Sequence, residues 1–539
     1  MKVFLRNKAG MQRIFRRLVW GVCLFSASSV VADTWNQFRG PGGSGVAKAT
    51  TAPIAPEDRN RAWTTHIPFG LSSPVMSETR VMVTGISDGR FQTLALDKET
   101  GRVVWQATAL EVALEKVHAA GSPAASTPHV DADGVYVFFG SFGLLCYDHD
   151  GRECWRKAVD TPKSLYGNST SLVGDEQRLY LVLDDERNLP DSKLTRSKVI
   201  AIDKQTGETL WETARPMHRS GWSTPTLWQK DDGAELVVLG QGRVASYAAD
   251  TGEERWFANG FSRETIAVPV IGNGKVYASA AMLGGVPDEH PDPQPFWAAV
   301  MQFDANKSGT LTREEMTAHF TFPFRPELNP AHPGYGMPMP KEPSKRKARL
   351  DGMFAQVDRN KDGEWSKEEF LARLNFNRGK PTLMAIEPGG VGDVGESKVA
   401  WRLHQSIPEV PSPLFYQDRL YMVRNGGFLS SVNAATGELV YRERLGASGP
   451  YSASPVLANG HLYLLSERGV LTVVKAGEPF EKVHQLDLRE RSSVTPAFDA
   501  TSLYVRTRQG LTTFRSQEEM PVPSEESDEI LHREDMPKQ

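Results

Sequence analysis

The 539-residue sequence predicts an all-β fold, an eight-bladed β-propeller with a small α-helical insertion. Three observations lead to this prediction. A turn that ends in tryptophan recurs along the chain, a residue–proline step opens an apolar strand in nearly every repeat, and one long gap between repeats holds two acidic loops. Repeats of about 40 to 50 residues with strand patterning are typical of four-stranded blades arranged around an axis.

The recurring turn is clearest at residues 95–105, where Ala-Leu-Asp leads through Thr100-Gly101 to Trp105. Glycine adopts positive φ without a Cβ clash, and the aspartate can accept bonds from the turn amides. The tryptophan gives the hairpin a large apolar anchor. Further copies end at an aromatic residue, and a last weak copy lies near Gly477; the aromatic residues are Trp155, Trp211, Trp256, Trp401 and Tyr441.

A second repeat gives an independent count of the blades. Proline suits the first residue of a strand, where its missing N–H costs least. Seven such steps occur at Ser73-Pro74, Thr127-Pro128, Thr224-Pro225, Val268-Pro269, Ser412-Pro413, Ser454-Pro455 and Thr495-Pro496. Ser171-Leu172 fills the remaining interval, so the sequence predicts eight blades.

Residues 1–32 have the pattern of a signal peptide. Six basic side chains precede the apolar run 18–31, and Val30-Val31-Ala32 offers a cleavage site of small residues. The alternative is a retained membrane anchor, but the run is shorter than the ~20 residues that a spanning helix needs. We therefore expect a periplasmic or secreted protein with no stable membrane span after cleavage.

Export changes the charge and the cysteine chemistry of the chain. Loss of six basic and no acidic side chains takes the formal net charge from −4 to about −10, so nucleic acid is not an expected partner. Cys146 and Cys154 then flank one turn on opposite strands. In an oxidising compartment they could form a disulfide, and two buried thiols are the alternative.

The chain divides into six segments. Residues 33–60 form an N-terminal loop segment that should pack Trp35 and Phe38 against a propeller face. The strand 61–68 should close the ring by pairing with 502–506 and 510–515, since closure removes exposed sheet edges. The predicted segments are a signal peptide (1–32), the loop segment (33–60), blades one to five in part (61–284), the insertion (285–379), the rest of blade five to blade eight (380–516) and a disordered acidic tail (517–539).

The insertion contains two twelve-residue loops, 304–315 and 358–369, with the spacing of calcium ligands. Calcium takes six to eight oxygens, supplied by side chains at positions 1, 3 and 5, a carbonyl at position 7 and a bidentate carboxylate at position 12, with glycine at position 6. The pattern resembles the EF-hand. The expected ligands are Asp304, Asn306, Ser308, Thr310 and Glu315 in the first loop, and Asp358, Asn360, Asp362, Glu364 and Glu369 in the second.

The two loops are not equivalent in charge. Position 5 is Ser308 in the first loop and Asp362 in the second, so the first should bind calcium more weakly. Apolar Leu311 and Trp365 at position 8 should pair the loops through a short strand contact. We expect entering helices at 295–303 and 350–357 and exiting helices at 313–320 and 367–374.

The turn pattern Ala-x-Asp-x-x-Thr-Gly-x-x-x-Trp of residues 95–105 resembles the repeat of PQQ-like β-propellers. This group includes quinoprotein dehydrogenases and the propeller lipoprotein of the outer-membrane assembly machine, and the likeness covers about residues 61–515 apart from the insertion. The repeat stabilises blades and performs no chemistry. A quinoprotein dehydrogenase would be expected to have adjacent cysteines, which Cys146 and Cys154 are not.

These observations favour an exported calcium-binding scaffold. Rigid blades present a broad face of variable loops, which suits binding of an envelope protein or an extracellular ligand. The alternative function is a PQQ-dependent oxidoreductase. Calcium at two sites is the expected cofactor and PQQ is doubtful; no catalytic residue is predicted, and the residues that would bind another cofactor are unknown.

Overall fold

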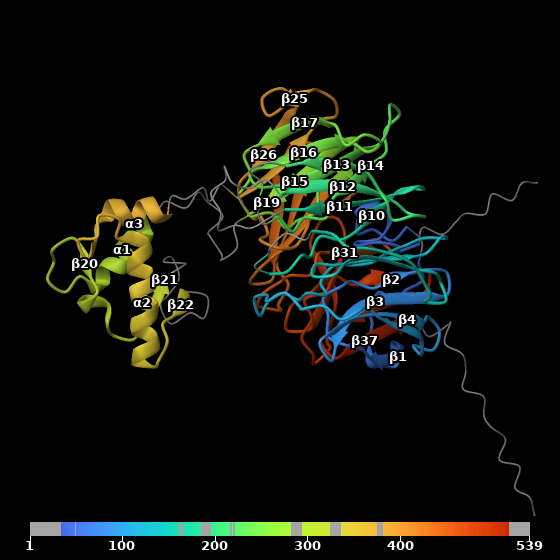
Figure 1. Cartoon of the computed structure of the whole chain (residues 1–539), viewed down its shortest axis with the longest axis horizontal. Helices are drawn as coiled ribbons and strands as arrows, with labels where there is room; N and C mark the ends of the chain where they lie inside the picture. Colours follow the sequence, from blue (N-terminus) through green and yellow to red (C-terminus); the bar gives the residue numbers. More distant parts are fainter. Residues whose placement is uncertain are drawn as a thin grey trace, which may run out of the picture. The chain divides into compact units, whose positions relative to one another are not determined.

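The structure is a computed structural model that describes residues 34–48, 50–160, 164, 166–184, 196–215, 218, 221–262, 264–281, 294–323, 336–374 and 381–516. The predicted signal peptide and acidic tail lie outside these residues. Eight sheets of four or five strands follow one another along the chain. Figure 1 labels strands of several of these sheets. The predicted all-β, eight-bladed propeller is confirmed.

Each blade is a meander whose first strand is short and buried at least in part and whose last strand is the most exposed. The first four blades are β2 (Val75–Met76), β3 (Arg80–Ser87), β4 (Arg90–Asp97) and β5 (Val103–Thr108); β6 (His129–Val130), β7 (Val135–Phe139), β8 (Gly143–Tyr147) and β9 (Glu153–Lys157); β10 (Val173–Gly174), β11 (Arg178–Leu183), β12 (Lys198–Asp203) and β13 (Thr209–Ala214); and β14 (Thr226–Trp228), β15 (Glu235–Gly240), β16 (Arg243–Ala248) and β17 (Glu254–Asn259). The burial gradient follows from radial packing, because the middle strands contact sheets on both faces.

The last four blades repeat the pattern. They are β18 (Val270–Gly272), β19 (Lys275–Ala280), β24 (Thr382–Ile386) and β26 (Val399–Leu403); β27 (Leu414–Tyr416), β28 (Arg419–Arg424), β29 (Phe428–Asn433) and β30 (Leu439–Arg444); β31 (Val456–Ala458), β32 (His461–Leu465), β33 (Val470–Lys475) and β34 (Glu481–Asp487); and β35 (Ala497–Phe498), β36 (Ser502–Arg506), β37 (Gly510–Arg515) and β1 (Arg61–His66). A short strand, β25 (Gly392–Asp393), adds in parallel to the outer edge of the fourth blade.

The ring is closed by the strand that the sequence predicted. β1 pairs antiparallel with β37, so the first strand of the chain becomes the outermost strand of the eighth blade. On the inner side, the buried Arg506 guanidinium donates to the carbonyl oxygens of Ser72 (2.9 Å), Pro68 (3.1 Å) and Thr84 (2.7 Å). The closure therefore joins the first and last blades through backbone ladders and through one buried cation.

Tryptophans join one blade to the next around the outside of the ring. The indole of Trp155 on β9 donates to the Lys204 carbonyl oxygen in the turn of the third blade (2.7 Å). A Cβ on Gly207 of that turn would lie 2.7 Å from the same indole. The arrangement recurs at five seams, with indole N–H to carbonyl distances of 2.7–3.1 Å; the donors are Trp63, Trp105, Trp155, Trp211 and Trp401.

Hydroxyl groups join the blades around the inside. The backbone N–H of Ser73, which opens the first blade, donates to Thr127 Oγ1 of the second blade at 2.9 Å. Six seams use this bond, at 2.9–3.0 Å; the acceptors are Thr127, Ser171, Thr224, Ser412, Ser454 and Thr495. The residue–proline steps thus mark the inner wall of the ring as well as the start of each blade.

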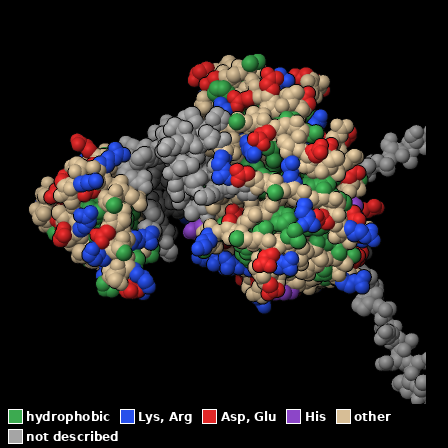
Figure 2. Space-filling view, in the orientation of Figure 1, with side chains coloured by type: hydrophobic (Ala, Val, Ile, Leu, Met, Phe, Trp, Pro, Cys, Tyr) green, Lys and Arg blue, Asp and Glu red, His purple; other side chains and the backbone are tan. Residues whose placement is uncertain are grey.

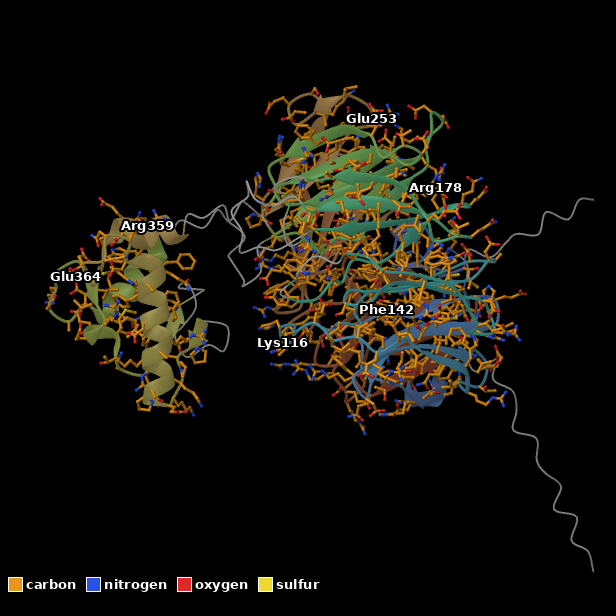
Figure 3. The ribbon with its side chains drawn as sticks, in the orientation of Figure 1. Lys116, Phe142, Arg178, Glu253, Arg359 and Glu364 are labelled. Atoms are coloured by element: carbon orange, nitrogen blue, oxygen red, sulfur yellow. The ribbon has the colours of Figure 1, made fainter. Side chains whose placement is uncertain are left out.

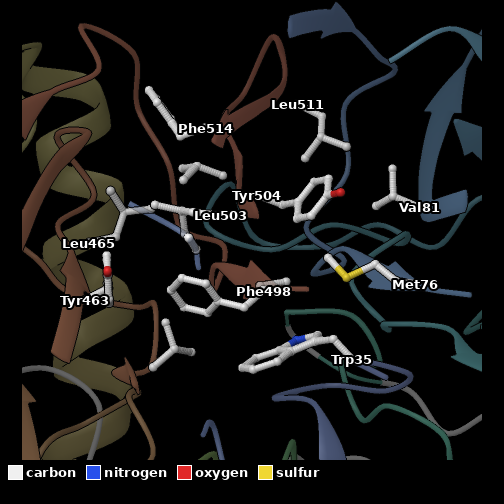
Figure 4. Close-up of a cluster of buried hydrophobic side chains, with 14 of the residues drawn as sticks. Trp35, Met76, Val81, Tyr463, Leu465, Phe498, Leu503, Tyr504, Leu511 and Phe514 are labelled. Atoms are coloured by element: carbon white, nitrogen blue, oxygen red, sulfur yellow. The ribbon is translucent and has the colours of Figure 1, made fainter. Parts of the chain in front are cut away.

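The N-terminal loop segment crosses one end of the ring. The Trp35 and Asn36 carbonyl oxygens accept the N–H groups of Met76 and Val130 (both 2.8 Å), in the first and second blades. Gly45 accepts the Leu457 N–H of the seventh blade (2.8 Å). Trp35 is buried against Phe498 of the eighth blade with ring centroids 6.0 Å apart, and Figure 4 shows this cluster. Residues 35–45, called the plug below, therefore contact widely separated blades.

Arg39 holds the plug against the sixth blade. Its buried guanidinium donates to the Pro413 carbonyl oxygen at 2.8 Å and to the Gly43 carbonyl oxygen at 3.1 Å. Burial lowers the pKa of Arg39 to about 9. The bonds to carbonyl dipoles compensate part of the cost of removing the charge from water.

The insertion forms its own small core between β19 and β24 of the fifth blade. Its elements are α1 (Gln294–Val300), a 3₁₀ turn (Met301–Phe303), β20 (Leu311–Thr312), a second 3₁₀ turn (Glu314–Met316), β21 (Thr321–Pro323), β22 (Gly336–Pro338), α2 (Pro343–Val357), β23 (Glu364–Trp365) and α3 (Lys367–Leu374). The predicted exiting helix at 313–320 is wrong, since only one 3₁₀ turn forms there. A strand, β21, begins directly after this segment at Thr321, where β-branched and aromatic residues favour extended backbone.

Candidate metal centre and axial pocket

The two acidic loops of the insertion are joined through a two-residue ladder. Leu311 pairs with Trp365 and Thr312 with Glu364, as position 8 of each loop predicted. Trp365 is fully buried and stacks on Phe354 of α2 with ring centroids 4.5 Å apart. Thr310 Oγ1 also donates to Glu364 Oε2 at 2.6 Å, so position 7 of one loop contacts position 7 of the other. Figure 3 labels Glu364 and Arg359 on the second loop.

In each loop the carboxylate at position 12 folds back over the loop entrance. Glu315 Oε1 accepts the Ala305 N–H at 3.1 Å, and its Oε2 accepts the Thr312 N–H at 2.9 Å. Glu369 repeats this with Arg359 (2.8 Å) and Ser366 (3.2 Å). The hydrogen bond from the Thr312 N–H is the main cause of the lowered pKa of Glu315. Both carboxylates are therefore held facing the loop.

The first residue of each loop differs in how its carboxylate is satisfied. Asp304 uses both oxygens, accepting the N–H groups of Ser308 (3.1 Å) and Gly309 (2.9 Å). Asp358 accepts only the Gly363 N–H, at Oδ2 (3.0 Å). Its Oδ1 is buried with no partner among the described residues. An orphaned buried oxygen at position 1 fits a cation ligand, because a buried carboxylate oxygen otherwise loses its hydration without compensation.

The ten predicted ligands all lie within the described residues and in the two loops. Within those residues, no group of three or more His, Cys, Asp or Glu side chains gathers closely enough to hold a metal ion. An EF-hand donor set relies also on amide, hydroxyl and carbonyl oxygens, here from Asn306, Ser308 and Asn360. The residue types, their spacing and the orphaned Asp358 oxygen fit calcium.

A pocket of about 390 Å³ lies on the axis of the propeller, and the sequence did not reveal it. Residues of all eight blades line it. They include the hydroxyl residues that open seven of the blades, which are Ser73, Thr127, Ser171, Thr224, Ser412, Ser454 and Thr495. Phe38 of the plug also lines the pocket. The plug lies at the ends of the innermost strands, whereas the hydroxyl residues that open the blades lie where these strands start. The pocket is therefore bounded by the plug on one side and by the loops between blades on the other.

The signal for this pocket was present in the sequence but was interpreted only as a strand marker. Ser and Thr recur one residue before proline, where a hydroxyl is not required to start a strand. Their second role, facing the axis, depends on ring closure and is visible only in the folded chain.

The pocket lining does not match an anionic quinone cofactor. Among the described residues that line it there is no lysine or arginine, and its carboxylates are Glu409 and Glu467. PQQ carries several carboxylates, which would be desolvated beside like charges without a cation to pair them. The described lining therefore offers no lysine or arginine to pair the carboxylates of PQQ.

The two cysteines in the described part of the chain, Cys146 and Cys154, are free thiols. Cys146 is buried on β8, and Cys154 is exposed on β9. Cys154 occupies the extra position of a bulge, where the register shifts opposite Cys146 and Tyr147. The alternative of two buried thiols is thus wrong for Cys154, because the bulge turns it to solvent.

The ring of eight four-stranded sheets places the protein in the class of β-propellers. The chain matches the model of the family described as outer membrane protein assembly factor BamB over residues 47–186, 195–286 and 389–518, well over half of its length. It belongs to this family of PQQ-like repeat propellers. Residues 301–320 and 350–374 match an EF-hand model, which indicates calcium binding.

Solved structures resemble the chain at low identity. BamB from Moraxella catarrhalis is 10% identical with a TM-score of 0.47, and the match covers 84% of this chain and 100% of that one. The computationally designed Ika8 protein is 10% identical with a TM-score of 0.49, covering 85% and 99%. The quinohemoprotein alcohol dehydrogenase ADHIIG from Pseudomonas putida HK5 is 13% identical with a TM-score of 0.44, covering 87% and 82%. The likeness concerns the fold alone.

No helix in the described part of the chain is both long and apolar enough to cross a membrane.

Proposed function

We propose that this protein is an exported, calcium-binding scaffold of the cell envelope that binds a protein segment or a small ligand in its axial pocket. The observation that supports this proposal most directly is the pocket itself, which is bounded by the plug and surrounded by loops from every blade. A cavity of about 390 Å³ lies within the usual range of ligand pockets, about 300–1,000 Å³. Loops positioned by a rigid ring are a common way to present binding residues.

A photo-crosslinking experiment tests the binding role. Ala120 is exposed and lines the pocket, and Leu210 is exposed on the outer strand β13 of the third blade. We expect the full chain carrying benzoylphenylalanine at Ala120 to form an adduct with an envelope component on irradiation. The matched Leu210 variant should form none. Equal adducts at both positions, or none at Ala120, would argue against the pocket as the binding site.

Calorimetric titration of PQQ into the full chain, with millimolar calcium and with a calcium-free control, tests the alternative function. We expect no saturable heat, because the described lining of the pocket offers two carboxylates and no lysine or arginine. Binding at micromolar affinity or tighter would support the PQQ-dependent oxidoreductase and would justify dye-linked substrate assays.

We further propose that calcium occupies both loops and that the second binds more tightly. Asp362→Ser gives the second loop the side chain that the first has at position 5. With one carboxylate fewer, its affinity should fall about tenfold, toward that of the first loop. Calcium titration by calorimetry measures both sites.

The control for this substitution is Glu368→Gln, which removes the same charge from an exposed residue at position 11. It should leave both affinities within about twofold. If Asp362→Ser also leaves the affinities unchanged, the difference in carboxylate number does not set the order of the two sites.

A further inference from the structure

The residues that open the blades place a ring of hydroxyl groups in the wall of the axial pocket. Six of these hydroxyls accept a backbone N–H of the preceding blade at 2.9–3.0 Å; they belong to Thr127, Ser171, Thr224, Ser412, Ser454 and Thr495. Each of these residues lines the pocket and is at most 4% exposed. Because backbone groups of the closed ring hold them, their positions are set before any ligand binds.

The six hydroxyl groups act as acceptors and still have a hydrogen to donate. A serine or threonine hydroxyl carries one O–H donor and two acceptor lone pairs. Within the described residues, none of the six donates its hydrogen to an acceptor of the protein. A buried O–H without an acceptor has lost its hydration without compensation, so this ring favours a ligand that accepts hydrogen bonds.

Ser73 adds a seventh hydroxyl, and this one has both roles free. Ser73 opens the first blade, lines the pocket and is 2% exposed. Its backbone N–H donates to Thr127 Oγ1 at 2.9 Å, but its own Oγ makes no hydrogen bond to any described part of the chain. Ser73 can therefore donate to a ligand and accept from it.

The charged groups around the pocket favour a neutral ligand. Both carboxylates of the lining already have partners. Ser452 Oγ donates to Glu467 Oε1, and Arg491 Nη2 lies 3.6 Å from Glu467 Oε2. Asn425 Nδ2 donates to Glu409 Oε2 at 3.1 Å. Basic and acidic side chains are interspersed over the propeller surface that Figure 2 shows, whereas the described lining has no lysine or arginine. An anion in the pocket would therefore lose its hydration with no such cation to pair it.

Aromatic rings form another part of the wall. Tyr166 lies edge-to-face with Trp222, with ring centroids 5.4 Å apart. The Trp222 indole N–H donates to Ser164 Oγ at 2.9 Å and to the Gly167 carbonyl oxygen at 3.1 Å, and these bonds fix the indole. Both rings line the pocket, and Phe38 of the plug adds a third. The pocket thus combines flat apolar surfaces with many hydroxyl groups, which suits a ligand with C–H faces and a polar rim.

We propose that the axial pocket binds an uncharged carbohydrate, either a free sugar or the terminal sugar of a glycan. Sugar hydroxyls project around the rim of the sugar ring and accept hydrogen bonds from the blade-opening hydroxyls. They also donate, and the Glu467 carboxylate has lone pairs left to accept these bonds. The plug bounds one side of the pocket, which favours the end of a glycan over a chain that passes through. This inference rests on the proposed binding role of the pocket.

A peptide fits the lining less well. Extended peptides are commonly recognised by a row of backbone N–H and C=O groups at a sheet edge. The donors here are side-chain hydroxyls, and they come from blades all around an axis.

Saturation-transfer NMR on the full chain tests the inference with the methyl glycosides of glucose, galactose, mannose and N-acetylglucosamine. We expect at least one of them to bind saturably. Calorimetry then compares the strongest binder with a trisaccharide that ends in the same sugar. Equal affinities would identify a single sugar as the ligand, and at least tenfold tighter binding of the trisaccharide would identify the end of a glycan.

Two further probes test the chemical class. The uronic acid of the strongest binder, in which a carboxylate replaces the C6 hydroxymethyl group, should bind at least tenfold more weakly. An end-blocked Ala-Ala-Ala tripeptide should show no saturable binding.

Two variants assign the binding to the pocket wall. Ser73→Ala breaks no hydrogen bond to the described residues and should weaken binding of the sugar about fivefold, the usual effect of one hydrogen bond. Tyr166→Leu keeps an apolar side chain and removes the ring, and it should also weaken binding. The matched control is Ser279→Ala, because Ser279 on β19 is buried, its Oγ has no partner among the described residues, and it does not line the pocket. This control should leave the affinity within twofold, and thermal melting checks that each variant is folded.

The inference is overturned by no saturable binding of any glycoside, by equal binding of the uronic acid, or by tighter binding of the tripeptide. Unchanged affinity in Ser73→Ala, or an equal loss in Ser279→Ala, would also overturn it. If crosslinking from Ala120 persists in these cases, the pocket still binds a partner and only the proposed ligand class is wrong. If both fail, the binding role itself is wrong.

Discussion

The seam between the fourth and fifth blades differs from the seams on either side of it. At both neighbouring seams a tryptophan on the outer strand, Trp211 or Trp401, donates to a carbonyl in the turn of the next blade. Here Trp256 donates to Glu235 Oε2 of its own blade at 3.0 Å. The turn of the fifth blade is longer and reaches back, with β25 pairing with β17 and the Val394 N–H donating to the Phe257 carbonyl oxygen at 2.8 Å.

The inner side of the same seam also lacks the N–H to hydroxyl bond that joins six of the other pairs of blades. Val268 opens the fifth blade and has no hydroxyl to accept the Thr224 N–H. Side chains of the fourth blade reach across instead, with Thr226 Oγ1 donating to the Pro269 carbonyl oxygen (2.6 Å) and Ser223 Oγ to that of Ala267 (2.8 Å). The comparison teaches that the repeat specifies contacts between neighbouring blades. A change in one blade alters the bonds of the blade before it.

The largest expected effect on the free energy of unfolding comes from replacing a turn glycine that packs against an indole ring. Gly207 and Gly389 lie in the turns of the third and fifth blades with φ of 73° and 81°, but only Gly207 faces an indole. Gly207→Ala should lower the free energy of unfolding by about 3 kcal/mol, from backbone strain and overlap with Trp155. Gly389→Ala should cost about 1 kcal/mol, because nothing lies within 4 Å of its added Cβ.

Denaturant unfolding of both variants measures this difference. In a double-mutant cycle, Gly207→Ala should cost less in the Trp155→Ala background than in the natural chain, since the overlap is then absent. Equal costs for the two glycine variants would show that the indole contact does not distinguish the seams.

A smaller effect should come from an ionisable group in the loop after the first blade. Glu115 accepts Asn168 Nδ2 at 3.4 Å, and burial raises its pKa to about 7 from a usual 4.5. Between about pH 4.5 and pH 7 the Glu115 carboxyl is therefore protonated in the folded chain and ionised in the unfolded chain. Stability from this group is present below pH 4.5 and is lost as the pH rises to about 7.

Glu115→Gln removes this dependence and keeps an acceptor for Asn168. The variant should be more stable than the natural chain by about 1–2 kcal/mol at pH 8 and about equal at pH 4. Urea unfolding at the two pH values provides the measurement. A constant difference at both values would show that the Glu115 carboxyl does not titrate in this window.

The smallest expected effect tests the inner seam directly. Val268→Thr supplies the missing hydroxyl and should add at most about 1 kcal/mol of stability, the usual net value of a hydrogen bond. Thr127→Val removes the equivalent acceptor at a regular seam and should cost about 1–2 kcal/mol. Destabilisation by Val268→Thr would mean that the bonds from Thr226 and Ser223 already satisfy this seam.

The sequence predicted the ring because its turn and proline patterns repeat. It predicted little about which side chains contact one another across neighbouring blades. The position of Trp155 was evident from periodicity, yet the residue was expected to anchor its own hairpin, whereas it packs on Gly207 of the next blade. Periodicity locates a residue within a repeat. It does not show which neighbouring repeat the side chain reaches, because that depends on the radial arrangement.

The two candidate sites illustrate the same limit. Each calcium loop is local, so Asp358 and Glu369 could be assigned from spacing within twelve residues. The pocket brings together Phe38, Tyr166, Glu409 and Glu467 from distant segments, and no short pattern joins them. The helix expected at 313–320 was wrong because the segment forms only a 3₁₀ turn, Glu314–Met316, before β21 begins at Thr321.

The closing strand has a consequence for when this protein can acquire its structure. Thr64 contacts Thr512, 448 residues further along the chain, and the plug contacts Leu457. The first segments to be synthesised therefore wait for the last before they find their partners, and an interrupted chain presents an open sheet edge at each end. High contact order of this kind slows folding. Under the proposed export, the ring would close only after nearly the whole chain had been translocated, and folding would be completed outside the compartment of synthesis.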